Sequence, residues 1–259
     1  MTVAMEQRCL SVIMPVFNEE SLVLAVLDRV LARPEVKEVV IVNDASTDGT
    51  WDCLQHVSNP RVRIFHQEKN CGKGAAVIRG LAEASAPFVI IQDADFEYHP
   101  DDYEHVLAPL LEGKAEVVYG SRFMGTPGQV RYFRHEMGNK FLTFLSNVCN
   151  DVHLTDMETC YKAFRREVIQ NLNLKSQRFG IEIEITAKLV LSRRLRIWEV
   201  PISYRPRSYD EGKKITWKDG LAAICHILRY NLFASKSTFY RQPWETLLGT
   251  VNLAGNKPI

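Results

Sequence analysis

Short apolar runs alternate with helix-like stretches through the first half of the chain, and this alternation limits the possible folds more than any other feature. The runs have the length of strands and cover residues 10–16, 38–43, 62–66, 88–92 and 116–120. Between them, apolar residues recur at helical spacing over 22–31, 50–57 and 72–84. Strands that alternate with helices predict a doubly wound α/β fold with a mostly parallel sheet, whose ligands bind at the carboxyl ends of the strands.

The pattern changes after the Gly- and Pro-containing loop at 125–130. We expect helices over 137–150, 181–192 and 216–234, a strand over 195–200, and a loose tail over 241–259. The chain has 259 residues, of which 46% are hydrophobic, so one core can account for the whole of it. The sequence therefore predicts a single domain over residues 1–240.

Charge and cysteine content exclude several classes of protein. The net charge is +1, which argues against a protein held to nucleic acid by its overall charge. The six cysteines form no CxxC pair and indicate reduced thiols. Because no apolar run reaches about 18 residues, the length needed to cross a bilayer, we expect a cytoplasmic protein that meets a membrane only at its surface.

Polar residues follow the predicted strands at the edge where ligands bind. Asn18, Glu19 and Glu20 follow the first strand, and Asp44 follows the second. Asp93 and Asp95 follow the fourth, with Glu97 two residues later. Carboxylate oxygens suit Mg²⁺ or Mn²⁺, which can also bind a diphosphate. A solvated acidic turn is the simpler explanation of an isolated Asp-x-Asp, so the interpretation depends on the neighbouring loops.

Gly72, Lys73 and Gly74 open a predicted helix, where free backbone N–H groups and an ammonium group could face a phosphate. The spacing of a complete P-loop is missing, so this segment is weak evidence by itself.

Taken together, these motifs resemble the family 2 glycosyltransferases, which have the GT-A fold. The segments that carry the resemblance are 11–20, 41–50, 70–74 and 92–95. Segments 120–123, 155–162 and 205–214 resemble the dolichol-phosphate mannose synthase branch, which transfers sugars to polyprenyl phosphates. The resemblance covers about residues 10–235 and implies a nucleotide-sugar-binding half at 10–123 and an acceptor-binding half at 124–235.

The resemblance implies a role for each matching position on the donor side. Asp93, Asp95 and Glu97 would bind the metal, although close relatives often have Gln at the position of Glu97. The nucleotide-sugar would contact Pro15, Val16, Asn18, Glu19, Asp44, Gly72, Lys73, Asp93 and Ala94. Asp95 would also take part in catalysis.

On the acceptor side, the resemblance places Arg122 beside the acceptor phosphate or the departing diphosphate, and Asp156 beside the donor sugar. A hydroxyl acceptor requires a general base, for which Glu158, Glu182 and Glu184 compete with Asp156. The acceptor and the diphosphate would also meet a basic cluster whose charge suits phosphorylated ligands, formed by Arg205, Arg207, Lys213 and Lys214. Solvated surface is the competing interpretation of this cluster.

The expected reaction is inverting, metal-dependent transfer of a hexose from a nucleotide-sugar to a polyprenyl phosphate at the cytoplasmic membrane face. Mannose from GDP-mannose is favoured, and UDP-glucose is the nearest rival donor. The sequence is also compatible with a soluble transferase that has a hydroxyl acceptor, and with a non-catalytic nucleotide-binding or membrane-docking protein. The apolar positions in 217–233 and 137–150 could belong to the core or to helices that lie on a bilayer.

Overall fold

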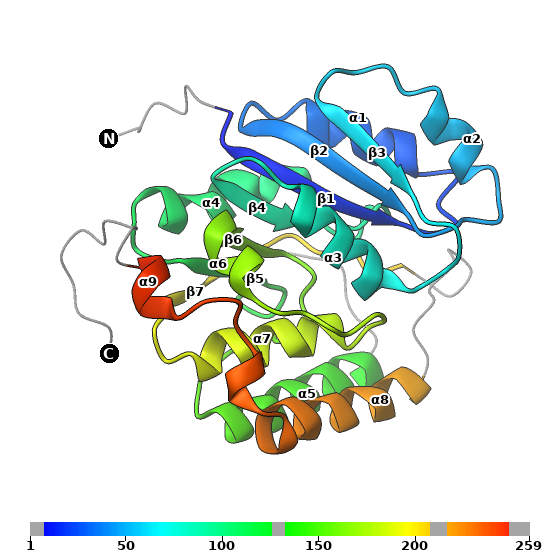
Figure 1. Ribbon diagram of the computed structural model, residues 1–259. Helices are drawn as coiled ribbons and strands as arrows, with labels where there is room; N and C mark the ends of the chain where they lie inside the picture. The colour runs from blue at the N-terminus through cyan, green and yellow to red at the C-terminus, as the bar shows by residue number, and fades with distance from the viewer. Residues whose placement is uncertain (1–7, 126–132, 208–216, 249–259) are drawn as a thin grey trace.

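The computed structural model describes residues 8–125, 133–207 and 217–248. Its centre is a seven-stranded sheet with the order β3-β2-β1-β4-β6-β5-β7 (Figure 1). Among the described strands, only β6 runs antiparallel to its neighbours, β4 and β5. The predicted α/β fold with a mostly parallel sheet is therefore confirmed. The strands are β1 (Leu10–Val16), β2 (Val36–Asn43), β3 (Val62–His66), β4 (Phe88–Ile91), β5 (Val117–Ser121), β6 (Lys162–Arg165) and β7 (Ile197–Pro201).

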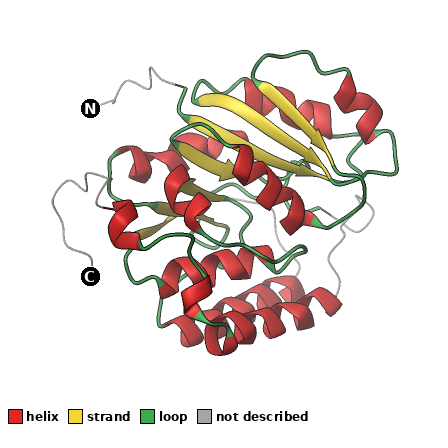
Figure 2. Cartoon of the chain, in the orientation of Figure 1, coloured by secondary structure: helices red, strands yellow, loops and turns green. Residues whose placement is uncertain are grey.

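Helices cover both faces of this sheet (Figure 2). The α-helices are α1 (Val23–Leu31), α2 (Thr50–Gln55), α3 (Lys73–Glu83), α4 (Tyr103–Leu111), α5 (Phe133–Asn150), α6 (Arg166–Asn171), α7 (Ile181–Leu191), α8 (Trp217–Leu228) and α9 (Trp244–Leu248). Helices α5, α7 and α8 pack against one another as a separate helical layer. The structure also has three short helical turns, η1 (Pro100–Asp102), η2 (Arg229–Phe233) and η3 (Lys236–Thr238).

Alternating side chains of each central strand enter two different cores. In β1, Val12 and Met14 join the core beneath α1 and α4, whereas Ile13 joins the core beneath α3 and α7. Both faces are thus covered, which is why the strand reads as a continuous apolar run instead of an alternating one.

The strand register brings the polar loops to one edge of the sheet. Val16 at the end of β1 pairs with Asn43 at the end of β2, and Ile13 pairs with Ile91 at the end of β4. The loops after these three strands therefore begin side by side. Each of them contains a residue with a left-handed backbone, at φ values of 52°, 54° and 57° for Asn18, Ala45 and Phe96.

The structure differs from the sequence-based expectations in three places. Strand β6 and helices α4 and α6 were not predicted. The expected helix over 216–234 is α8 followed by the π-helical turn η2. In place of a loose tail from residue 241, α9 buries Trp244 and Leu247 against the core, so the packed part of the chain reaches beyond residue 240.

Candidate functional site

The loop after β2 is tied to the start of α3 by Asp44. Its carboxylate accepts hydrogen bonds from the backbone N–H of Cys71 at 2.8 Å, from that of Gly72 at 2.7 Å, and from the Gln67 side chain at 2.8 Å. Asp44 is almost fully buried. Asp44 and the Gly72 amide, both predicted to contact the nucleotide, are therefore hydrogen-bonded to each other.

The loop after β1 is held against the same region. Asn18 accepts a hydrogen bond from the backbone N–H of Thr47 at 2.8 Å, while the buried Glu19 donates its own N–H to Thr50 at 2.9 Å. Pro15 and Val16 lie just before this loop, buried in β1. The predicted nucleotide-binding residues of the first two loops are therefore neighbours.

The glycines at the start of α3 are required by close packing. A Cβ atom at Gly74 would collide with the carbonyl oxygen of Ser176, and one at Gly72 would lie 2.6 Å from that of Gln177. Gly72 also has a φ of 93°, which L side chains rarely adopt. These glycines let the segment before α7 cross the end of α3, and this crossing places α7 beside Lys73.

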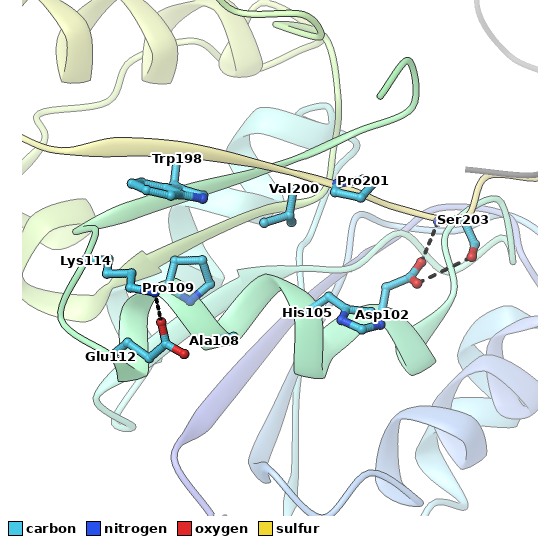
Figure 3. Close-up of a pocket in the computed structure, with 10 residues that line it drawn as sticks. All are labelled: Asp102, His105, Ala108, Pro109, Glu112, Lys114, Trp198, Val200, Pro201 and Ser203. Carbon is cyan, nitrogen blue, oxygen red and sulfur yellow. Dashed lines mark hydrogen bonds and ion pairs between the residues drawn. The ribbon is translucent and has the colours of Figure 1, made fainter. Parts of the chain in front are cut away.

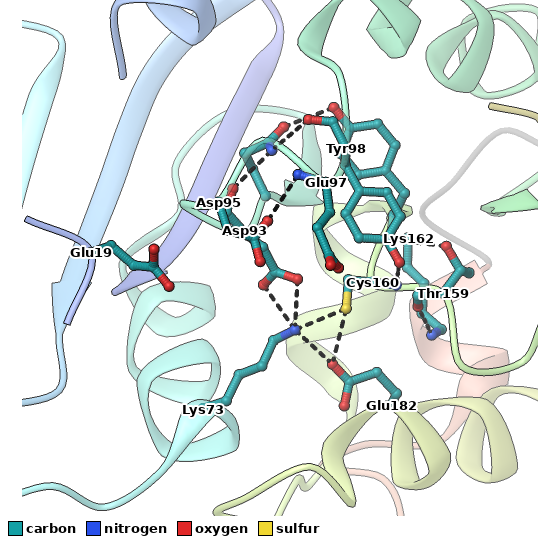
Figure 4. A network of polar contacts seen from close by, with 12 residues as sticks. Glu19, Lys73, Asp93, Asp95, Glu97, Tyr98, Thr159, Cys160, Lys162 and Glu182 are labelled. Carbon is teal, nitrogen blue, oxygen red and sulfur yellow. Dashed lines mark hydrogen bonds and ion pairs between the residues drawn. The ribbon is translucent and has the colours of Figure 1, made fainter. Parts of the chain in front are cut away.

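Lys73 joins three separate segments of the chain (Figure 4). Its ammonium lies 2.8 Å from Asp93 and 3.1 Å from Glu182, and it donates a hydrogen bond to the Cys160 sulfur at 2.9 Å. Burial acts to lower the pKa of Lys73, but these neighbours outweigh it and hold the pKa well above its usual range. Burial raises the pKa of Asp93, but Lys73 outweighs this effect and leaves it below the usual value. Lys73 and Asp93 therefore form a charged pair.

Asp95 is paired with an arginine from a distant segment. The Arg207 guanidinium lies 2.9 Å from Asp95 and 3.1 Å from Glu19. Burial, together with the nearby charges of Asp93 and Glu97, raises the pKa of Asp95 to about 7 despite this pairing. Glu97 accepts hydrogen bonds from the Tyr204 hydroxyl at 3.1 Å and from the Arg207 backbone N–H at 2.9 Å.

The three predicted metal ligands lie on one turn after β4, but in this structure they bind protein cations and hydrogen-bond donors. Within the described ranges, no three His, Cys, Asp or Glu side chains are gathered closely enough to hold a metal ion. The donor set nevertheless fits a hard divalent cation, because it consists of carboxylates, and burial together with the charges of Asp93 and Glu97 raises the pKa of Asp95, which a bound cation would offset. Asp93, Asp95 and Glu97 are the residues that would hold such a cation.

Arg122 and Asp156 form a buried ion pair. Two guanidinium nitrogens lie 2.7 Å from the two carboxylate oxygens, and the Arg122 backbone N–H donates a third bond to Asp156 at 3.0 Å. Asp156 is fully buried and Arg122 is 8% exposed. Burial acts to lower the pKa of Arg122, but Asp156 outweighs it and raises the pKa well above the usual value. Both oxygens of Asp156 are thus engaged.

The glutamates that compete with Asp156 have different surroundings. Glu184 accepts bonds from Lys188 and from the backbone N–H groups of Lys175 and Ser176, so it ties α7 to the preceding segment. Glu182 has one oxygen beside Lys73, while its buried Oε2 has no hydrogen-bond partner among the described residues.

Glu158 also carries a buried oxygen without a hydrogen-bond partner in the described part of the chain, its Oε1. Burial and the charge of Glu182 raise the pKa of Glu158 to about 7. Lys162 lies nearby in β6 with its ammonium on the carbonyl oxygens of Met157 and Thr159. Sequence reasoning did not single out Lys162 or Cys160. The available signal was that both residues lie in segment 155–162, which carries part of the resemblance.

The predicted basic cluster is only partly described. Arg207 points into the site, whereas Arg205 is exposed and contributes its backbone N–H to the Glu97 carbonyl at 3.0 Å. Lys213 and Lys214 lie outside the described residues.

A groove of about 420 Å³ lies elsewhere, between α4 and β7 (Figure 3). Asp102, His105 and Trp198 are among its lining residues, and it includes none of the residues predicted for the site. The chemistry predicted from the sequence is therefore concentrated at the strand ends and not in this groove.

Several curated proteins are similar to this chain. The UDP-N-acetylglucosamine–dolichyl-phosphate N-acetylglucosaminyltransferase of Methanococcus voltae is 28% identical over 76% of this chain and 86% of its own length. The undecaprenyl-phosphate mannosyltransferase of Micrococcus luteus is 27% identical over 93% of this chain and 98% of its own length. The dolichol-phosphate mannosyltransferase of Pyrococcus furiosus is 27% identical over 78% of this chain, which spans 58% of that protein.

The fold is also similar to a solved structure, that of glucosyl-3-phosphoglycerate synthase from Mycobacterium tuberculosis in complex with Mn²⁺ and UDP-glucose. The TM-score is 0.68 at 22% identity, with 89% of this chain and 83% of that chain covered. Residues 11–172 match the family described as Glycosyl transferase family 2. This match spans more than half of the chain and includes all three polar loops, Lys73, Arg122 and Asp156. The chain therefore belongs to glycosyl transferase family 2 and is a glycosyltransferase.

Proposed function

We propose that this glycosyltransferase moves a hexose, with inversion, from a nucleotide-sugar to a polyprenyl phosphate at the cytoplasmic face of a membrane. Mannose from GDP-mannose is the favoured donor. Relatives named as polyprenyl-phosphate or dolichol-phosphate mannosyltransferases support the acceptor class and the sugar. Two observations carry the proposal together. The turn after β4 that contains Asp93, Asp95 and Glu97, here called the carboxylate turn, is flanked by the cations of Lys73 and Arg207. Nearby helices expose an apolar face.

The charged residues of the site suit a reaction between two phosphorylated ligands. A bound Mg²⁺ or Mn²⁺ would neutralise charge on the donor diphosphate. Lys73 and Arg207 flank the carboxylate turn, and both would be available to a diphosphate once their carboxylates bind a metal. A phosphate acceptor is already anionic near pH 7, since its second pKa is about 6, so it needs little proton removal. Stabilising the leaving diphosphate is then the main task of the site.

An apolar stripe on α5 supports a lipid acceptor. Its members recur at helical spacing and are between 48% and 77% exposed: Phe133, Met137, Phe141, Phe144 and Val148. Leu221 on α8 and Leu232 and Phe233 on η2 are exposed as well, and α5 packs against both elements. No helix within the described residues is both long and apolar enough to cross a bilayer. We propose that these exposed apolar residues of α5, α8 and η2 lie on the membrane surface.

The apolar stripe lies close to the Arg122–Asp156 pair. Lys140 on α5 places its ammonium 5.7 Å from the centre of the Phe123 ring, and the Arg122 guanidinium carbon lies 5.7 Å from the same ring. A lipid phosphate brought in along α5 would therefore meet Lys140 and then Arg122. This arrangement supports the predicted role of Arg122 beside the acceptor phosphate.

A two-stage experiment tests the proposal. Thermal shifts with Mn²⁺ and GDP-mannose, UDP-glucose or UDP-N-acetylglucosamine identify the donor, because a ligand that binds only the folded state raises its stability. Transfer is then measured to a polyprenyl phosphate and to a free sugar with hydroxyl groups only. We expect GDP-mannose to give the largest shift and transfer to require the lipid phosphate. Transfer to the free sugar alone would refute the proposed acceptor, and a larger shift with a UDP-sugar would refute the proposed donor.

A further inference from the structure

Glu182 is a buried carboxylate that the proposed chemistry leaves unused. It stands in the first turn of α7 and is 5% exposed. Its Oε1 lies 3.1 Å from the Lys73 ammonium, whereas its Oε2 has no hydrogen-bond partner among the described residues. A buried acceptor without a partner costs about 1–3 kcal/mol, and more when it is charged, so its presence requires an explanation.

Glu158 gives a second, independent indication at the same place. Its Oε1 is buried and also has no hydrogen-bond partner in the described part of the chain. The Cys160 sulfur, two residues after Glu158, lies 3.8 Å from the Glu182 Oε1, so the two carboxylates belong to segments that are in contact. They come from different elements, the loop before β6 and the first turn of α7. Two unsatisfied acceptors that converge from separate segments indicate a subsite that a ligand completes.

The charge of this subsite limits the kind of ligand. The unpaired Oε2 of Glu182 needs a hydrogen-bond donor, which phosphate and diphosphate oxygens cannot supply, and the charge of Glu182 repels them. A neutral ligand with several hydrogen-bond donors meets no such repulsion. The hydroxyl groups of a sugar are such donors, and hydrogen bonds to ionised acceptors are the strong ones.

The position of Glu182 agrees with this choice. Lys73 bridges Glu182 and Asp93, so the subsite adjoins the carboxylate turn that would hold the donor diphosphate (Figure 4). Glu184, two residues further along α7, is fully engaged with Lys188 and two backbone N–H groups, and it fixes the helix that carries Glu182. The unsatisfied carboxylate is thus mounted on a rigid element beside the donor site.

We infer that Glu182, assisted by Glu158, recognises the hydroxyl groups of the donor hexose and determines which sugar the enzyme accepts. This inference rests on the proposed function, because it assumes a nucleotide-sugar donor. It assigns Glu182 to ground-state recognition of the sugar. Proton removal from the acceptor is not part of this role.

The test compares a nucleotide diphosphate with the corresponding nucleotide-sugar. Calorimetric titrations with Mn²⁺ and either GDP or GDP-mannose, and with UDP and UDP-glucose, are made on the wild type and on Glu182→Gln. The control is Glu104→Gln, the same change in the first turn of α4 at an exposed position. We expect Glu182→Gln to bind the nucleotide-sugar about tenfold more weakly, which corresponds to the loss of one charged hydrogen bond.

The diphosphate alone distinguishes sugar recognition from a structural role. Glu182→Gln leaves Lys73 with one carboxylate instead of two, so the diphosphate should bind as tightly as to the wild type or more tightly. A structural defect would weaken both ligands by the same factor, and that result would overturn the inference. Unchanged binding of both ligands would overturn it as well. A wild type that binds the diphosphates but none of the nucleotide-sugars would refute the proposed function instead.

Glu158→Gln provides a second variant in case the first does not fold. We expect a weaker effect in the same direction, with binding of the diphosphate unchanged. A donor that lacks one ring hydroxyl completes the test. It should bind the wild type more weakly, and the Glu182→Gln penalty should shrink for the hydroxyl that this residue contacts. An equal penalty for every deoxy donor would contradict direct recognition.

Discussion

Replacing Asp156 by Asn tests whether the Arg122–Asp156 pair builds the site or acts chemically within it. The amide keeps the size of the carboxylate but carries one donor group in place of an oxygen. One oxygen can still accept from the Arg122 Nε and backbone N–H, now at 2.7 Å and 3.0 Å. The second guanidinium nitrogen, now 2.7 Å from the other oxygen, would face the NH₂ group. The variant therefore leaves a buried guanidinium without its counter-charge.

The expected loss of stability follows from the burial of the pair. Breaking a buried ion pair on one side costs about 3–5 kcal/mol. Because the amide would keep part of the hydrogen bonding, we expect a cost near the lower end, about 3 kcal/mol, for Asp156→Asn. In a chain of this size, each kcal/mol lowers the melting temperature by roughly 2–4 °C, which gives a fall of roughly 6–12 °C. Arg122 would also lose its fixed orientation, so turnover should fall together with stability.

Urea denaturation and turnover are measured on the same preparations. The control is Glu112→Gln, which makes the same chemical change in the ion pair between Lys114 and Glu112. Both of those side chains are about half exposed, so the control should change stability by less than about 0.5 kcal/mol. If Asp156→Asn keeps the stability of the wild type while turnover collapses, the carboxylate acts on the substrate and our structural argument is wrong.

Three further predictions concern the metal site, Glu158 and the apolar stripe. Replacing Arg207 by Gln releases Asp95, so Mn²⁺ should bind the protein about threefold to tenfold more tightly in the absence of nucleotide-sugar, as measured by electron paramagnetic resonance. Unchanged or weaker binding would contradict the idea that Arg207 and the metal compete for Asp95. Burial raises the pKa of Glu158 to about 7, so ionisation opposes folding as pH rises from about 4.5 to 7. Glu158→Gln should therefore stabilise the protein by about 1 kcal/mol at pH 8 but not at pH 4, and equal effects at both pH values would refute this sign. Phe141→Glu with Phe144→Glu should reduce flotation with phospholipid vesicles at least tenfold while GDP-mannose binding stays unchanged, and undiminished flotation would exclude this face.

Much of the sheet could be predicted because its strands are buried on both faces. Strands β1, β2 and β4 are nearly uniform apolar runs, and each ends in a polar loop, so both the element and the ligand-binding edge are visible in the sequence. Strand β6 has only four residues, and one of them is the buried Lys162. Its charge is satisfied by backbone carbonyl oxygens of the preceding loop, a tertiary arrangement that periodicity does not reveal.

The members of the site were easier to predict than their partners. Asp93, Asp95, Lys73 and Arg207 were all singled out from sequence motifs, but the sequence does not show which cation faces which carboxylate. Glu182 illustrates this limit. Both Glu182 and Glu184 alternate with isoleucines at the start of α7, so the sequence pattern does not distinguish them. Glu184 pairs with Lys188 one turn further along the same helix, whereas only the crossing of α3 by the segment before α7 places Glu182 beside Lys73.

Asp93 and Asp95 connect the two predicted halves of the domain to one turn. Asp93 is paired with Lys73 from the predicted donor half, and Asp95 is paired with Arg207 from the predicted acceptor half. A ligand that binds both carboxylates must therefore weaken one contact from each half. The two released cations would lie on either side of the same turn, where they favour a diphosphate more than an isolated phosphate because it offers charge to both. Donor binding would in this way reposition Arg207, which belongs to the segment expected to meet the acceptor.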